Sequence, residues 1–280
     1  MTTPQAVLIT GCSSGVGEAT AWRFLRAGQP VYATARDADS LAELAAAGAV
    51  TLRLDVTDEA SMAEVVKRVE SEHGAVGILV NNAAYGIQGA VEATGLDDAR
   101  RQFETNFFGL VGLSQLTLPG MRSRRTGRII NVASMGGHFS LPGAGFLHAS
   151  KYAVEAISDA LRLELRGFGI RVVIVEPGPI RTPFPSKINA TIPRASGGPY
   201  DAFHAAVESR VNAAYEQRAL SMALSPEKVA RVIERAAKSN RPRARYPVGV
   251  MARGLIALSR YLPDFALDAV TRSQFPDPRP

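Results

Sequence analysis

The stretch Thr10-Gly11-Cys12-Ser13-Ser14-Gly15-Val16-Gly17 decides the fold of this 280-residue chain. The apolar run Val7–Thr10 leads into it, and residues 18–27 after it have a helical pattern. Glycines let backbone N–H groups approach a pyrophosphate, and the N-terminus of the following helix favours its negative charge. The spacing G-x-x-x-G-x-G is not the commonest dinucleotide fingerprint, but a place between a strand and a helix is the context that supports one. The expected dinucleotide contacts are Gly11, Ser13, Ser14, Gly15, Val16 and Gly17.

Short runs rich in Val, Ile and Leu alternate with longer helical patterns along the chain. The runs are as short and apolar as strands buried on both faces should be. Strand–helix alternation implies right-handed crossovers between parallel strands. We therefore expect an α/β fold, a doubly wound parallel sheet of the Rossmann type with six or seven strands. The expected strands are Val7–Thr10, Val31–Thr34, Thr51–Leu54, Ile78–Asn81, Arg128–Val132 and Arg171–Val175, and the expected helices cover about 16–27, 39–47, 58–73, 97–123 and 146–168.

The chain is expected to form one domain, residues 1–280, because no long linker, repeat or low-complexity tract interrupts it before residue 180. Residues 180–224 follow Pro179 and are rich in proline and glycine, which predicts an irregular or helical excursion. An excursion after the sixth strand lies beside the carboxyl ends of the strands, where ligands bind in such sheets. We interpret it as a substrate lid, with a surface insertion as the alternative, and residues 225–280 as a C-terminal extension.

Composition narrows the possible classes of protein. Hydrophobic residues make up 46% of the chain, but their runs are too short to span a bilayer, and the N-terminus has no cleavable hydrophobic segment. We expect a soluble cytoplasmic protein. Cys12 is the single cysteine, which excludes an intrachain disulfide and a thiol-based zinc site. His73 and His204 have no partners at metal-ligand spacing, so no metal is expected.

Positive charge gathers near the C-terminus. Residues 231–280 hold nine Arg and one Lys against four acidic residues, a net +6, and the rest of the chain is neutral. A solvated basic face explains this, and attraction to an anionic ligand, membrane surface or nucleic acid is the alternative. No nucleic-acid motif accompanies the charge, so no nucleic-acid partner is expected. The amphipathic segment Val248–Val270 is expected to pack against the lid; interfacial membrane contact, helped by Arg253 and Arg260, is the alternative.

The end of the second expected strand indicates which dinucleotide binds. An NAD-binding protein usually has Asp or Glu there to hold the ribose 2′-hydroxyl. Here Ala35 stands at that place and Arg36 follows it, and a guanidinium suits a 2′-phosphate. We therefore expect NADP(H). Asp37 is the counter-evidence, because a small shift of alignment would make it an NAD-type acid, and Arg36 would then be a plain surface residue.

Further motifs follow the glycine-rich loop in a fixed order. Together they cover about residues 5–182, and with them the chain resembles the classical short-chain dehydrogenase/reductase family. The strand end Ala33-Thr34-Ala35-Arg36 and the long C-terminal part are most similar to the NADP-preferring branch that acts on retinoids, steroids and other apolar ketones. The motifs are Leu54-Asp55-Val56, Asn81-Asn82-Ala83-Ala84, Asn106, Asn131-Val132-Ala133-Ser134, Lys151 and Pro177-Gly178-Pro179-Ile180-Arg181-Thr182.

The resemblance implies a role for each motif in cofactor binding. Asp55 and Val56 would lie at the adenine. Ile180 and Thr182 would hold the nicotinamide carboxamide. The remaining implied cofactor contacts are Asn82, Ala83, Ala84 (where the family more often has Gly), Pro177 and Gly178. Read without the family, Asp55 could equally cap a helix.

The resemblance also implies the residues of the reaction centre. Asn106 would order a helix bend and a water, Ser134 would hydrogen-bond the substrate oxygen, and Lys151 would bind the nicotinamide ribose and lower the pKa of the catalytic acid. The alternatives are a buried polar bridge for Asn106, a turn residue for Ser134 and a solvated helix charge for Lys151. The implied reaction interconverts a ketone or aldehyde with an alcohol on a moderately apolar small molecule.

One position departs from the family pattern Tyr-x-x-x-Lys. Four residues before Lys151, where the resemblance implies the catalytic tyrosine, this chain has Leu147. Carbonyl reduction needs a proton donor at the substrate oxygen, and leucine can neither donate nor accept a proton. Loss of a positioned acid typically costs about 10²–10⁴ in rate. Leu147 therefore stands in the catalytic centre with no acid to contribute.

Three explanations for Leu147 stay open. The chain is an engineered or inactivated reductase, or another group supplies the proton, or the fold binds NADP(H) for isomerisation, cyclisation or sensing. Candidate replacement donors are His148 and Tyr152, which a rotation of about 100° per residue turns away from the 147/151 side of the helix, and the loop residues His138 and Tyr85.

The expected helix 146–168 also suggests how copies of the chain assemble. Apolar residues recur on it at i, i+4 spacing, at Ala153, Ile157, Leu161 and Leu165. Such a stripe is typical of a core-facing or dimer-forming surface. Because family members commonly pair through this helix and the one at 97–123, we expect a homodimer or homotetramer.

Overall fold

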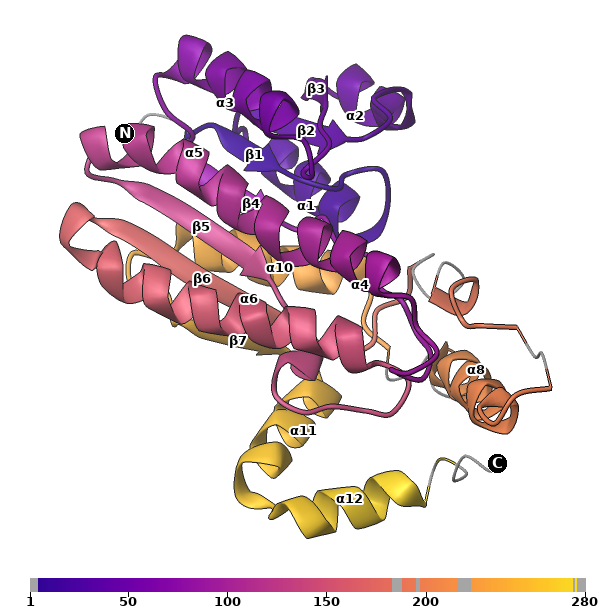
Figure 1. Ribbon diagram of the computed structural model, residues 1–280. Coiled ribbons are helices and arrows are strands. Elements are labelled where there is room, and N and C mark those ends of the chain that lie inside the picture. The colour runs from indigo at the N-terminus through magenta and orange to yellow at the C-terminus, as the bar shows by residue number, and fades with distance from the viewer. Residues whose placement is uncertain (1–4, 183–187, 195–196, 216–222, 274, 276–280) are drawn as a thin grey trace.

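The computed structural model describes residues 5–182, 188–194, 197–215, 223–273 and 275. Its centre is a seven-stranded sheet, ordered β3-β2-β1-β4-β5-β6-β7, in which every neighbouring pair is parallel (Figure 1). The order reverses between β1 and β4, which confirms the doubly wound α/β fold. The strands are β1 Val7–Ile9, β2 Val31–Ala35, β3 Val50–Arg53, β4 Ile78–Asn81, β5 Gly127–Val132, β6 Ile170–Pro177 and β7 Arg245–Val248.

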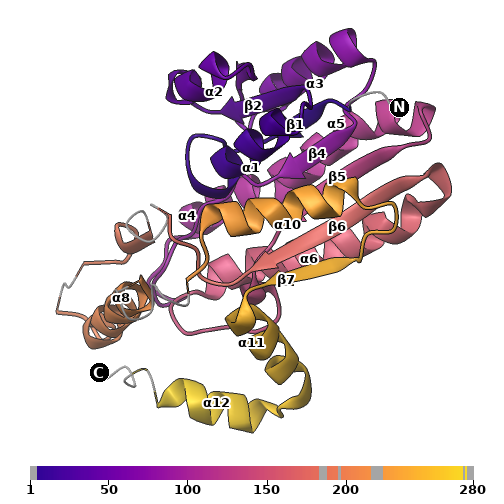
Figure 2. The same ribbon diagram turned by 180° about the vertical axis from the view of Figure 1, so that it is seen from behind.

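Helices cover both faces of the sheet, as Figures 1 and 2 show from opposite sides. One core layer contains Val7 and Ile9 of β1, and the other contains Leu8, because successive side chains of a strand point to opposite faces. The first layer packs under α1 Gly15–Arg26, α2 Ala42–Ala46 and α10 Pro226–Lys238. The second packs under α3 Glu59–His73, α5 Gly109–Ser123 and α6 Gly145–Glu164.

The expected helix 97–123 is interrupted in the structure. It consists of α4 Leu96–Phe103, a π-helical turn at Glu104–Phe108, and α5. A π-helical turn inserts one extra residue and is frequent at functional sites. Short 3₁₀ turns complete the main body: η1 Asp39–Leu41, η3 Met135–Gly137 and η4 Arg166–Phe168.

Beyond the carboxyl ends of the strands lie the excursion after β6 and the C-terminal helices (Figure 1). The expected lid, 180–224, contains α8 Asp201–Tyr215, and its residues 183–187, 195–196 and 216–222 lie outside the described part. The amphipathic segment forms two helices, α11 Val250–Tyr261 and α12 Asp264–Arg272. Within the described residues, no helix has the length and apolar character needed to cross a bilayer. The division into one domain with a lid and an extension stays a prediction.

Candidate active site

A cleft of about 2070 Å³ follows the carboxyl ends of the strands. It brings together side chains from motifs that are up to 170 residues apart in the chain. Of the expected site residues, only Gly17 and Asn106 do not line it. The expected residues along its wall are Gly11, Ser13, Ser14, Gly15, Val16, Arg36, Asp55, Val56, Asn82, Ala83, Ala84, Ser134, Leu147, Lys151, Pro177, Gly178, Ile180 and Thr182.

The glycine-rich loop has a backbone that only glycine adopts without strain at two positions. Gly11 has φ 71° and Gly15 has φ 64°. A Cβ on Gly15 would lie 2.9 Å from Cγ2 of Thr182, so the loop closely approaches the segment after β6. Ser14 precedes α1 in an extended conformation, and its side chain makes no capping hydrogen bond. It therefore does not occupy the first-turn N–H groups of α1 that a pyrophosphate would use.

Asn82 braces this loop from the end of β4. Its Nδ2 donates to the carbonyl oxygens of Thr10 (2.9 Å) and Gly11 (3.1 Å). In return, the hydroxyl of Thr10 accepts hydrogen bonds from the backbone N–H groups of Asn82 (3.0 Å) and Ala83 (2.9 Å). These four bonds fix the two strand ends between which a dinucleotide would lie.

The end of β2 presents Arg36 to the cleft. Asp37, the residue that argued for NAD, is exposed, and its Oδ1 accepts a hydrogen bond from the backbone N–H of Asp39 at 3.1 Å. Asp55 also bonds locally: its Oδ1 accepts hydrogen bonds from the backbone N–H (3.0 Å) and the hydroxyl (2.8 Å) of Thr57. Partial burial opposes ionisation of Asp55, but the Thr57 bonds and the charge of Arg36 hold its pKa below the usual value. The cap of α3 is Asp58, so Asp55 is not a helix cap.

Ser134 and Lys151 lie on the floor of the cleft at the end of β5. Ser134 precedes η3, and its Oγ accepts a hydrogen bond from the N–H of Gly136 at 3.1 Å. Lys151 is only 7% exposed, and its Nζ donates to the carbonyl oxygen of Val132 at 3.0 Å. Burial lowers the pKa of Lys151 to about 8. The alternative of a solvated helix charge for Lys151 is therefore wrong.

Asn106 is buried in the π-helical turn behind the cleft wall. Its Oδ1 accepts from the N–H of Tyr85 (3.0 Å), and its Nδ2 donates to the carbonyl of Tyr85 (2.8 Å) and to Oγ of Ser150 (3.0 Å). The side chain thus joins the loop after β4 to α6, one residue before Lys151. Both expectations apply to it, the helix irregularity and the buried polar bridge.

Comparison with known proteins identifies the family of this chain. The family model described as short chain dehydrogenase matches residues 5–193. This chain belongs to the short-chain dehydrogenase family. It is 36% identical over 263 residues to a 3-ketodihydrosphingosine reductase of Bacteroides thetaiotaomicron, covering 93% of this chain and 94% of the relative. It is 34% identical to human retinol dehydrogenase 5, covering 97% and 89%. A short-chain dehydrogenase structure from Streptomyces avermitilis, 32% identical, matches with a TM-score of 0.79 over 97% and 95% of the two chains.

This family member has Leu147 facing the cleft where the resemblance implies a tyrosine. Like the side chain of Ile188, the side chain of Leu147 lies close to Gly86 in the loop after β4. A Cβ placed on Gly86 would lie 3.1 Å from Cδ2 of Leu147 and 3.3 Å from Cδ1 of Ile188. The position is half-buried, so a longer side chain there would extend into the cleft.

The four candidate replacement donors all border the cleft. The Nδ1 of His148 lies 2.8 Å from the carbonyl of Phe139, and burial lowers the pKa of this imidazole, which favours its neutral form. The Nε2 of His138 lies 2.7 Å from a carboxylate oxygen of Glu176. Burial raises the pKa of the Tyr85 and Tyr152 phenols and makes both weaker acids. Neither phenol therefore has a pKa shifted toward easier proton donation, and the imidazole of His148 does not have a pKa shifted toward its charged form.

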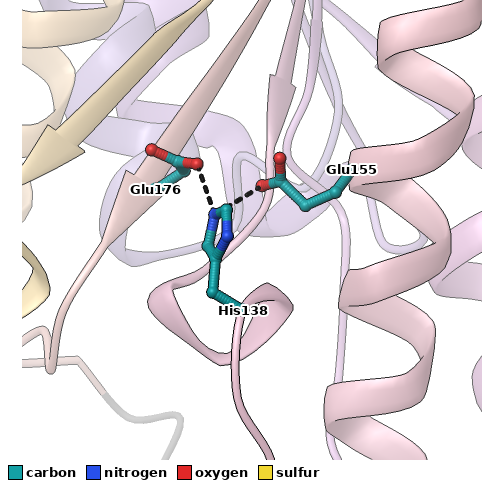
Figure 3. A group of neighbouring side chains, drawn as sticks. All are labelled: His138, Glu155 and Glu176. Atoms are coloured by element: carbon teal, nitrogen blue, oxygen red, sulfur yellow. Dashed lines mark hydrogen bonds and ion pairs between the residues drawn. The ribbon is translucent and has the colours of Figure 1, made fainter. Parts of the chain in front are cut away.

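The structure also reveals a cluster of polar residues of which the sequence analysis had singled out only His138. His138 lies between the carboxylates of Glu155 and Glu176 (Figure 3). Arg245 of β7 also contacts both carboxylates. All four residues are more than 15 positions from their partners in the chain, so no local pattern could connect them. The one available signal was Glu155, one helical turn after Lys151.

Proposed function

We propose that this chain binds NADP(H) in the cleft and interconverts a ketone or aldehyde with an alcohol, with turnover limited by Leu147. The observation that carries the proposal is that Ser134 and a buried Lys151 share one cleft with the glycine-rich loop. Members of this oxidoreductase family use a nicotinamide cofactor, and NADP(H), when bound, would supply or accept the hydride.

Preference for NADP(H) over NAD(H) is supported by the end of β2. Arg36 lines the cleft and Asp37 bonds to its own turn. A guanidinium can form paired hydrogen bonds with a 2′-phosphate, whereas NAD binding would need a carboxylate at the same place.

Each residue of the reaction centre would have a separate task. The hydroxyl of Ser134 would donate to the substrate oxygen. The ammonium of Lys151 would bind the nicotinamide ribose and, as a cation, stabilise the charge that develops on the substrate oxygen. No acid stands at position 147 to transfer the proton to that oxygen.

A moderately apolar substrate is supported by the outer part of the cleft. It is lined by Ile188, by Val207 of α8 and by leucines of α11 and α12. The names of two relatives, a 3-ketodihydrosphingosine reductase and a retinol dehydrogenase, also indicate apolar substrates for those proteins. We propose the same broad class for this chain.

The test is the Leu147→Tyr variant, with Leu147→Phe as the matched control that adds the ring without the hydroxyl. NADPH oxidation is followed by absorbance over a panel of ketones and aldehydes. We expect Leu147→Tyr to raise turnover by about a hundredfold or more, because a positioned general acid contributes about 10²–10⁴. Leu147→Phe should not raise it. Equal gains in both variants would show that ring packing, not proton transfer, was missing.

A second candidate function follows from Leu147 itself. A cleft that holds NADP(H) without an acid also suits a non-redox enzyme, such as an isomerase or cyclase, or a silent binding protein. NADPH binding without any turnover in either variant would favour this alternative. A cytoplasmic location and a homodimer or homotetramer stay predictions, which fractionation and light scattering would check.

A further inference from the structure

A buried cluster of ionisable side chains lies directly beneath the catalytic floor. His138 follows η3, Glu155 lies on α6 and Glu176 is the second-last residue of β6 (Figure 3). The fourth member, Arg245, is the first residue of β7. Glu176 is fully buried and Glu155 is 6% exposed. The proposed function gives this cluster no role.

The contacts of the cluster leave two carboxylate oxygens without a donor. The Nε2 of His138 lies 2.7 Å from Oε1 of Glu176, and Nε of Arg245 lies 2.9 Å from Oε2 of Glu155. Oε1 of Glu155 and Oε2 of Glu176 are buried and have no hydrogen-bond partner among the described residues. A buried acceptor without a donor is costly. A proton on either carboxyl would remove one charge and provide one donor.

Charge counting leads to the same conclusion. Arg245 is shared, because its Nη2 also donates to Oδ2 of Asp159 at 2.6 Å, and Asp159 in turn pairs with Arg162 at 3.1 Å. Three carboxylates therefore face two guanidinium groups, and the third carboxylate has no hydrogen-bonded cation unless the cluster gains a proton, either on a carboxyl or on the imidazole of His138. The ammonium of Lys151, also on α6, interacts electrostatically with Glu155 but donates its hydrogen bond to the carbonyl oxygen of Val132.

The cluster also lies where the η3 turn packs on α6. A Cβ on Gly137 would lie 2.9 Å from Cγ of Glu155 and 3.1 Å from the carbonyl oxygen of Lys151. The turn that starts at Ser134 thus packs directly on the helical turn that connects Lys151 to Glu155. His138, at the other end of η3, holds this turn to β6 through Glu176.

We propose that His138, Glu155, Glu176 and Arg245 form a proton-sharing clamp that positions Ser134 against Lys151. When the clamp holds its proton, the two glutamates do not repel each other, and the η3 turn stays against α6. When the proton leaves, the repulsion loosens this contact. The four are positioning residues, and the proposal rests on the proposed function only for the roles of Ser134 and Lys151.

The pKa values of the clamp support this assignment and set the sign of its pH dependence. Burial, and then the charge of Glu176, raise the pKa of Glu155 to about 7, above its ordinary value of 4.5. The folded protein then binds more protons than the unfolded chain between these pH values. The stabilisation that comes from the proton bound at Glu155 is therefore present at low pH and is lost as the pH rises through about 7.

The first test compares thermal unfolding of the wild type, Glu155→Gln and the control Glu164→Gln across this range. Glutamine at 155 imitates the protonated carboxyl and cannot titrate. We expect the Tm of Glu155→Gln minus that of the wild type to rise by about 3 °C or more between pH 5 and pH 8. Glu164 is exposed on the same helix, and its variant should follow the wild type. Parallel curves for Glu155→Gln and the wild type would overturn the proposal. If Glu155→Gln does not fold, Glu176→Gln is measured in the same way.

The second test measures positioning rather than stability. NADPH affinity, followed by fluorescence, should weaken about threefold as the pH rises through about 7 in the wild type, since Lys151 is expected to hold the nicotinamide ribose. The step near pH 7 should be absent in Glu155→Gln, in which only the weakening caused by deprotonation of Lys151, whose pKa is lowered to about 8, remains. An identical step in both proteins would overturn the positioning role while leaving cofactor binding intact. A failure of NADPH to bind any variant would instead count against the proposed function and not against the pH-dependent Tm.

A metal ion is the competing explanation for the grouping of His138, Glu155 and Glu176. Excess Zn²⁺ is therefore added to the wild type and to His138→Asn. Unchanged Tm values support the clamp, because a proton already balances the charge. A Tm increase in the wild type that His138→Asn abolishes would replace the clamp with a metal site.

Discussion

Gly17 is the residue at which the loop tolerates least change. A Cβ there would overlap the carbonyl oxygen of Gly11 and would lie 2.7 Å from Nδ2 of Asn82. Both neighbours are fixed by the hydrogen bonds that brace the loop, so neither can move without opening the dinucleotide site. Gly17 thus acts through packing, although it does not line the cleft.

We expect Gly17→Ala to weaken NADPH binding at least about tenfold and to lower the free energy of unfolding by about 1–3 kcal/mol, as overpacking does. The control is Gly254→Ala on α11, where a Cβ would meet nothing within 4 Å. It should be neutral or slightly stabilising, since alanine is the better helix former. Fluorescence titration and thermal unfolding measure both quantities. Unimpaired NADPH binding by Gly17→Ala would contradict the packing argument.

Arg36 and Asp37 give opposite answers on cofactor choice, and substitution separates them. Arg36→Ala should weaken NADPH binding by about tenfold or more, because a lost charge-assisted hydrogen bond costs about 1.5 kcal/mol or more. The same variant should leave NADH binding nearly unchanged. Asp37→Ala is the matched variant and should alter neither, because its side chain bonds to its own turn. Isothermal titration with each dinucleotide measures the four constants. Loss of NADH affinity in Asp37→Ala would reverse the assignment.

At the scale of elements, the apolar pattern predicted strands β1 to β6. Each predicted strand end lies within three residues of the end in the structure. β7 was missed as a named strand, because Arg245, Tyr246 and Pro247 lack the apolar run of the others. It lies at the edge of the sheet, where proline is tolerated, and Arg245 is held by carboxylates from α6 and β6 that no local pattern connects to it.

The helix interruption at Glu104–Phe108 was hidden for a different reason. A single π-helical turn shifts the apolar period by only one residue, which is within the irregularity of ordinary helices. The cleft itself was predictable, because parallel strands bring the ends of β1, β2, β4, β5 and β6 to one edge, and the motifs sit at those ends. The clamp was not, because its residues meet only after the strands and α6 have packed.

At the scale of the whole molecule, the cleft has two ends built from different parts of the chain. The expected cofactor residues lie between 11 and 182, whereas α8, α11 and α12 border the outer end. Phe275 connects these outer parts: its ring lies 5.9 Å from that of Phe203 on α8, and Arg210 stacks 5.6 Å above it. Among the described residues, the last buried apolar residue is Ile256, on α11, so α12 adds little to the two main core layers.

Truncation after Leu262 should therefore separate the two ends of the cleft. We expect the truncated chain to bind NADPH with unchanged affinity and to unfold within a few degrees of the full chain. In the Leu147→Tyr background, its KM for long-chain aldehydes should rise about tenfold, since removing buried contacts to two or three methylene groups costs about 1.4 kcal/mol or more. Its KM for short aldehydes should stay the same.

Two point variants in the full chain control for the truncation itself. Leu267 lines the cleft from α12, whereas Phe265 on the same helix is 77% exposed and does not. Leu267→Ala should raise the KM for long-chain aldehydes, and Phe265→Ala should not. If both variants raise this KM equally, the stability of α12, and not a direct contact with the substrate, determines the KM. If the truncation weakens NADPH instead, the outer helices support the cofactor end, and the separation of the cleft into two ends is wrong.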